Sequence, residues 1–137
     1  MEPASLPQRP NLAYPGARPY AELPEVLGGF DVALMPFARN EATASISPTK
    51  TLEYLAAGLP VVSTRVPDVV ADHAAVVDLQ DDAAGFADAC LRVHGHDLSE
   101  RDRKLAPLLA RQDWDRIADD MLGLITALDR QALDVAG

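Results

Sequence analysis

A short polar segment near the middle of the chain has the residue types that hold an anionic ligand. Ser47, Thr49 and Lys50 lie within four positions of one another, and Glu53 follows one helical turn after Lys50. At the start of a helix, free backbone N–H groups and the positive end of the helix dipole attract anions. A carboxylate accepts hydrogen bonds from paired hydroxyls, such as those of a ribose. These residues predict a phosphate site beside a hydroxyl-binding carboxylate, and they indicate no reaction by themselves.

A surface ion pair is the structural alternative for Lys50 and Glu53. Opposite charges three residues apart stabilise a helix by about 0.2–0.5 kcal/mol without any ligand. His94 and His96 form a weak metal pattern, because two ligands in a loop with no nearby cysteine make a poor site. We therefore expect no metal. His73 is predicted to lie in a loop or at the surface.

The composition disfavours several classes of function. The chain has 137 residues, of which 48% are hydrophobic, and a net charge of −9. This length suits one domain with its own core, and the acidity disfavours nucleic acid and anionic lipid as partners. Cys90 is the only cysteine, so no intramolecular disulfide can form, which suits a cytoplasmic protein. No apolar stretch approaches the ~20 residues that span a bilayer, and we expect a soluble protein.

The elements that position the polar segment follow from the hydrophobic pattern. A helix is predicted over 48–57, with Ser47 as its N-cap, Pro48 at its first position and Gly58 after its end. The apolar run 30–37 is typical of a strand buried on both faces of a parallel sheet. The predicted strands are 11–15, 30–37, 60–64 and 75–79.

Helices account for most of the remaining chain. A short helix over 20–27 is expected to end at the glycines that follow it, and three helices close the chain. The first carries Cys90 as a small core residue, and Pro107 is expected to kink or end the second. The third begins at Trp114 and has one apolar face, formed by Ile117, Met121, Ile125 and Leu128.

This alternation of strands and helices predicts an α/β fold with a parallel sheet. Four strands are fewer than the roughly five to six of a doubly wound sheet. The sheet is therefore expected to lack its first elements.

Segment 47–64 resembles the donor-binding signature of the retaining GT-B glycosyltransferases, in the family 4-like group. It reads Ser-Pro-Thr-Lys-Thr-Leu-Glu-Tyr-Leu-Ala-Ala-Gly-Leu-Pro-Val-Val-Ser-Thr. Segments 16–24 and 30–37 resemble the elements that precede this signature, and 112–115 resembles the start of a late helix. The similarity covers roughly 11–128, in order, which is more specific than any single short motif.

The resemblance implies roles for the polar segment. Glu53 matches the carboxylate that binds the donor ribose, and Ser47, Thr49 and Lys50 match the loop and helix start that receive the diphosphate. The family often has a second glutamate, which would fall at position 45, where this chain has Ser45. This departure leaves the recognition of the donor sugar by a carboxylate open.

Two further groups of residues match the family. Arg18 and Tyr20 fall where the nucleobase is contacted, largely through backbone. Asn40, Glu41 and Thr43 lie in the loop expected near the donor sugar, where Glu41 or Asn40 could take over the role of the missing glutamate.

The resemblance also implies a domain organisation. The chain is expected to be a single domain, 1–137, that forms the Rossmann-like C-terminal half of a GT-B enzyme. Within it, 1–10 is an irregular lead-in, 11–95 the nucleotide-sugar-binding core and 99–133 the C-terminal helices. The family's N-terminal acceptor domain and its basic diphosphate clamp are missing from this chain. We therefore expect an isolated chain that is inactive and self-associates, and a parent enzyme peripheral to the membrane.

The activity implied is transfer of a hexosyl group from a UDP- or GDP-sugar to a glycan or lipid-linked acceptor, in polysaccharide biosynthesis and without a cofactor. The alternative is a non-catalytic module that binds a nucleotide sugar or phosphate, or a degenerate paralogue of such an enzyme. A nucleotide-sugar epimerase is less favoured, because a Gly/Glu-rich loop would be expected where this chain has 45–50.

Overall fold

A three-stranded parallel sheet forms the centre of the structure, a computed structural model that describes residues 6–135. The strand order is β1-β2-β3, and Val61 of the central strand is paired with Ala33 on one side and Val77 on the other. One helix connects each pair of neighbouring strands, so the predicted α/β fold with a parallel sheet is confirmed. The strands and connecting helices are β1 (Ala33–Met35), α2 (Lys50–Ala56), β2 (Val61–Thr64), α3 (Pro67–His73) and β3 (Val77–Gln80).

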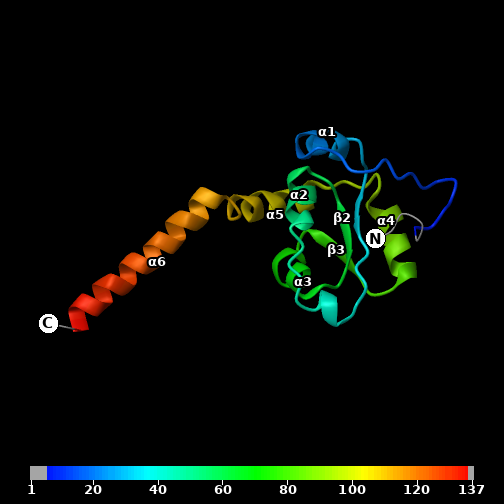
Figure 1. Cartoon of the computed structure of the whole chain (residues 1–137). Helices are drawn as coiled ribbons and strands as arrows, with labels where there is room; N and C mark the ends of the chain where they lie inside the picture. The colour runs from blue at the N-terminus through cyan, green and yellow to red at the C-terminus, as the bar shows by residue number, and fades with distance from the viewer. Residues whose placement is uncertain (1–5, 136–137) are drawn as a thin grey trace.

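The core lies around the central strand. Val61, Val62 and Ser63 of β2 are at most 2% exposed, and Leu55 of α2 and Val69 of α3 are fully buried. Helix α4 (Ala83–Val93) contacts β2 and β3, whereas α5 (Ser99–Ala110) packs on α2. Figure 1 shows the sheet between α4 on one side and α2 and α3 on the other. Helices therefore cover both faces of β2 and β3, as is usual for parallel strands.

The end of α2 is fixed by a glycine. Gly58 has a φ of +77°, in the left-handed region. Its N–H donates to Leu55 O at 3.0 Å, and Leu59 N donates to Tyr54 O at 3.1 Å, which together make a Schellman motif. Arg101 of α5 also donates to the Gly58 carbonyl at 2.8 Å. This turn thus aims the chain from α2 into β2, as the sequence predicts.

Three sequence predictions for the first half of the chain are wrong. Residues 11–15 form no strand and are exposed, because the prolines at either end lack the N–H that a ladder needs. β1 is shorter than predicted and open on one face, since Leu34 is 50% exposed at the edge of the described sheet. Helix α2 begins at Lys50 with Thr49 as N-cap. Ser47 does not cap it, because the first bond, from Thr51 N to Pro48 O, makes a tighter turn ahead of the helix.

The second half contains one unpredicted helix and two smaller differences. Helix α3, with Pro67 at its start, was not predicted, and its last residue, His73, is buried rather than in a loop. Strand β3 begins two residues later than predicted. Helix α5 continues through Pro107 to Ala110, so the proline does not end the helix. Cys90 of α4 is partly buried.

The last helix, α6 (Trp114–Val135), projects away from the rest of the molecule (Figure 1). Trp114 begins it, as predicted, and is 80% exposed. Met121, Ile125 and Leu128 on the predicted apolar face are each more than half exposed. Self-association through this face stays a prediction. Within residues 6–135 no helix is long and apolar enough to cross a membrane.

Replacement of Gly58 by alanine is expected to destabilise the fold by about 1–2 kcal/mol, because a Cβ disfavours the left-handed conformation. Space is not the cause, since nothing lies within 4 Å of the added Cβ. Gly123→Ala is the matched control, because that glycine lies in α6 with open space around it and alanine favours a helix. Urea unfolding measures both. Equal free energies of unfolding for Gly58→Ala and the wild type would contradict the role of this turn.

Candidate functional site

A cavity of about 300 Å³ joins two of the predicted ligand-binding residues. Tyr20 comes from the short 3₁₀ helix η2 (Tyr20–Glu22), and Glu53 comes from the first turn of α2. The remaining wall is apolar and is supplied by α1 (Leu23–Leu27) and the end of α2, with residues Leu23, Pro24, Leu27, Ala56 and Ala57. An aromatic ring and a carboxylate on an apolar wall suit a base and its ribose. Arg18 is not part of this lining and approaches Glu22 to 3.9 Å.

Lys50 and Glu53 form an ion pair at the start of α2. The Lys50 Nζ and Glu53 Oε2 atoms are 2.6 Å apart, and the two side chains are 53% and 28% exposed. The hydrogen bond to Glu53 raises the pKa of Lys50 above its ordinary value, so the ammonium stays charged. The surface ion pair considered from the sequence is therefore present. It leaves Glu53 with acceptor capacity for other donors, because a carboxylate has about four lone-pair sites.

Ser47 and Thr49 lie in a different cavity from Glu53. This second space, of about 120 Å³, is lined by the turn before α2, by α3 and by Gln112. Asp68, Asp72 and His73 are the α3 residues in its wall. The structure therefore separates the residues predicted to contact the diphosphate into two groups, with Lys50 paired to Glu53, and Ser47 and Thr49 in a cavity that α3 also lines.

The loop after β1 is held by its own side chains. Thr43 N donates to Asn40 Oδ1 at 3.2 Å, and Asn40 N donates to Thr43 Oγ1 at 3.1 Å, so the pair makes a capping box for the short helix η3 (Glu41–Thr43). Asn40 and Thr43 line a cavity of about 290 Å³ together with Arg39 and Arg65. Glu41 is exposed in η3.

A charged cluster that was not predicted from the sequence lies at the carboxyl ends of the strands. Asp81 accepts from Arg39 Nη1 through one oxygen and from Arg65 Nε through the other, both at 3.0 Å. Arg65 and Asp81 directly follow β2 and β3, and Arg39 lies four residues after β1. The carboxyl ends of parallel strands meet at one edge, which is where open α/β sheets bind ligands. The positions of Arg39, Arg65 and Asp81 shortly after the three strands were the signal in the sequence that could have indicated this cluster.

His73 is the buried titratable group next to these sites. Its side chain is 8% exposed, and Nδ1 has no hydrogen-bond partner among the described residues. Burial lowers the pKa of His73 below its ordinary value of 6.5, and the nearby Asp72 carboxylate opposes this effect. Within residues 6–135, no three His, Cys, Asp or Glu side chains are grouped so that they could hold a metal ion.

Comparisons with known proteins agree with the resemblance carried by segment 47–64. The family model described as "Glycosyl transferases group 1" matches residues 2–96. The chain is 30% identical over 109 residues to a Bacillus subtilis protein named "Putative teichuronic acid biosynthesis glycosyltransferase TuaH". That alignment covers 77% of this chain and 28% of the relative, so the chain matches less than a third of the relative's length. No solved structure matches the chain.

The free energy of unfolding is expected to decrease as the pH is lowered, because of His73. The pKa of His73 is lower in the folded chain than in the unfolded chain. As the pH falls through about 6.5, the imidazole is therefore protonated in the unfolded chain before it is protonated in the folded chain. The stability contributed by neutral His73 is therefore complete above that pH and is lost below it. Urea unfolding at pH 7.5 and about 5 should show a smaller pH dependence for His73→Gln than for wild type, whereas His94→Gln, at an exposed position, leaves it unchanged. The same slope in all three proteins would contradict the argument.

Proposed function

Since the chain belongs to the glycosyl transferases group 1 family, we propose that it binds the nucleotide-sugar donor of a hexosyl transfer reaction. The donor is a UDP- or GDP-sugar, and the acceptor is a glycan or a lipid-linked sugar. The reaction retains the configuration of the donor sugar and needs no cofactor. The full enzyme is expected to act in the cytoplasm, at the membrane surface.

The cavity between α1 and α2 carries this proposal. It brings the aromatic ring of Tyr20 and the carboxylate of Glu53 to one apolar space of about 300 Å³, which lies within the range of ligand pockets. The base contacts the apolar wall near Tyr20, with Arg18 close in sequence. The ribose hydroxyls donate to Glu53, whose second partner is Lys50.

The diphosphate then lies at the start of α2. Lys50 is a half-exposed cation at that end, whereas Thr49 and Ser47 line the neighbouring cavity ahead of the helix. Positive charge there stabilises the negative charge that develops on the departing nucleoside diphosphate. The capped loop of Asn40, Glu41 and Thr43 holds polar groups beside the donor sugar.

UDP or GDP is expected to stabilise the folded chain, because a ligand that binds only the native state shifts the unfolding equilibrium. At a concentration of 100 times the dissociation constant the gain is about 2.7 kcal/mol. Thermal melts with UDP, GDP, ADP and TDP measure it, with inorganic phosphate and uridine as controls for each half of the ligand. Melts that no nucleotide moves at millimolar concentration would argue against the donor site.

Glu53→Gln is expected to weaken nucleotide binding by roughly tenfold while sparing the fold, because a charge-assisted hydrogen bond contributes about 1.5–3 kcal/mol. Glu100→Gln is the matched control, since Glu100 pairs with Lys104 at 2.8 Å on exposed helix α5, away from the cavity. Isothermal titration gives the affinity and urea unfolding the stability. A large loss of stability with unchanged affinity would make Glu53 a structural residue.

A further inference from the structure

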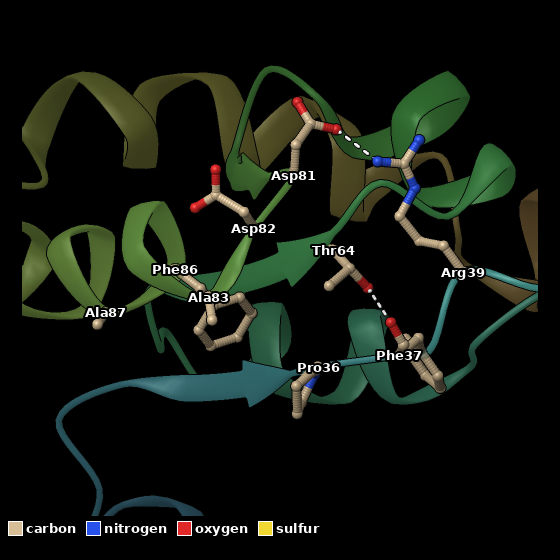
Figure 2. Close-up of a pocket in the computed structure, with 9 residues that line it drawn as sticks. All are labelled: Pro36, Phe37, Arg39, Thr64, Asp81, Asp82, Ala83, Phe86 and Ala87. Carbon is tan, nitrogen blue, oxygen red and sulfur yellow. Dashed lines mark hydrogen bonds and ion pairs between the residues drawn. The ribbon is translucent and has the colours of Figure 1, made fainter.

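A cavity of about 440 Å³ lies at the carboxyl edge of the sheet (Figure 2). Its lining is mixed, since Phe37 lies below Arg39 and Asp82 lies above Ala83 in this view. Pro36 and Phe86 lie at one end, whereas Arg39 and Asp81 lie at the other. The cavity shares no lining residue with the one between Tyr20 and Glu53. It is therefore a separate space, with its own apolar wall and its own charges.

The charges at the polar end leave hydrogen-bond donors for a ligand. A guanidinium has five N–H donors, and among the described residues Arg39 and Arg65 each use one, on the two oxygens of Asp81. Two cations therefore share one carboxylate. Their side chains are 57% and 45% exposed, so solvent and ligands can reach them.

The other polar groups of the cavity are committed to the fold. Thr64 Oγ1 donates to Phe37 O at 2.9 Å. Asp82 Oδ1 accepts from Gly85 N at 2.8 Å as the N-cap of α4, so the positive end of that helix offsets its charge. The hydrogen-bond donors left at the cavity belong to Arg39, whereas Asp81 and Asp82 add two carboxylates to its lining. An anionic group on the ligand therefore has one place to bind, at the Arg39 guanidinium.

The apolar end favours a ring. The side chains of Pro36, Ala83 and Phe86 line it, and Figure 2 shows the Phe86 ring beside Ala83 at this end of the space. An aromatic ring packs well against the flat apolar face of another ring. An acidic group on such a ring then reaches toward Arg39 at the opposite end.

We propose that this cavity binds a sugar ring that carries a carboxylate or phosphate group. The acidic group pairs with Arg39, and the C–H face of the ring packs on Phe86. Arg65 donates to the other oxygen of Asp81 and so helps to balance the charge of that carboxylate. The choice of a sugar among ring-shaped anions rests on the proposed function, whereas the anionic contact rests on the geometry.

Titration of the 15N-labelled full chain tests the proposal. The probes are glucuronate, glucose 1-phosphate, glucose and inorganic phosphate. We expect saturable shifts of the Ala83 and Phe86 amides with both acidic sugars, and affinities at least about tenfold weaker for glucose, which lacks the charge-assisted bond. Equal binding of glucose, or of inorganic phosphate without the ring, would overturn the site as described.

Substitutions of the charged residues test whether the acidic sugars bind in this cavity. Arg39→Gln is expected to weaken the binding of both acidic sugars by about tenfold or more. Arg39→Lys keeps the ion pair with Asp81 and is expected to weaken their binding by less. Asp81→Asn removes the competing carboxylate and is expected to tighten binding. Arg103→Gln, at an exposed position on α5, is the matched control. Affinities that are the same in the Arg39 variants and the wild type would refute the assignment.

The nucleotide experiment separates this inference from the proposed function. If UDP binds in a Glu53-dependent way and the acidic sugars do not bind, only the present inference fails. If the acidic sugars bind through Arg39 and no nucleotide binds, the proposed nucleotide site is contradicted and the proposed acidic-sugar site is supported. UDP and glucuronate could instead compete for one site. If they compete in the wild type and Glu53→Gln abolishes that competition, the sugar binds in the nucleotide cavity and the proposal is overturned.

Discussion

The hydrogen bonding of β2 to parallel neighbours on both sides is the constraint on which the other features depend. Because all three strands run in the same direction, each must be followed by a crossover, and every strand delivers its next residues to the same edge. Arg65 and Asp81 meet there although sixteen residues separate them in the chain. Residues Val61 to Ser63 are buried, and their burial holds this register. A slip of one residue would turn every side chain of β2 to the opposite face.

The chain places its polar groups in separate spaces around that edge. Tyr20 and Glu53 line one cavity, Ser47 and Thr49 line a second with α3, and Arg39 lines two further cavities. Two cations near that edge, Lys50 and Arg39, are each paired with one carboxylate. Such pairs keep the cations in place at little cost, because exposed ion pairs contribute only about 0–1 kcal/mol. A ligand can rearrange them without disturbing the core.

The sequence predicted those elements whose signals are local. The apolar run before Thr64, the glycine at position 58 and the period of α4 and α6 each depend on neighbours in the chain, and the structure contains all of them. Helix α3 was missed because seven residues between two strands give too short a period to detect. The cluster around Asp81 was missed for a different reason. Its partners come together only through strand order and register, which no single segment encodes.

The exposure of helix α6 affects how the molecule unfolds locally. It contains 22 residues, a length of about 33 Å at 1.5 Å per residue, and its apolar side chains from Met121 to Leu128 gain little from burial. Protection of its amides from hydrogen exchange must therefore come from the helix's own ladder, whereas the amides of β2 exchange only when the sheet opens. The chain thus contains two cooperative units of unequal stability. A subunit or domain that covered α6 would merge them, and slow exchange along the helix would report the contact.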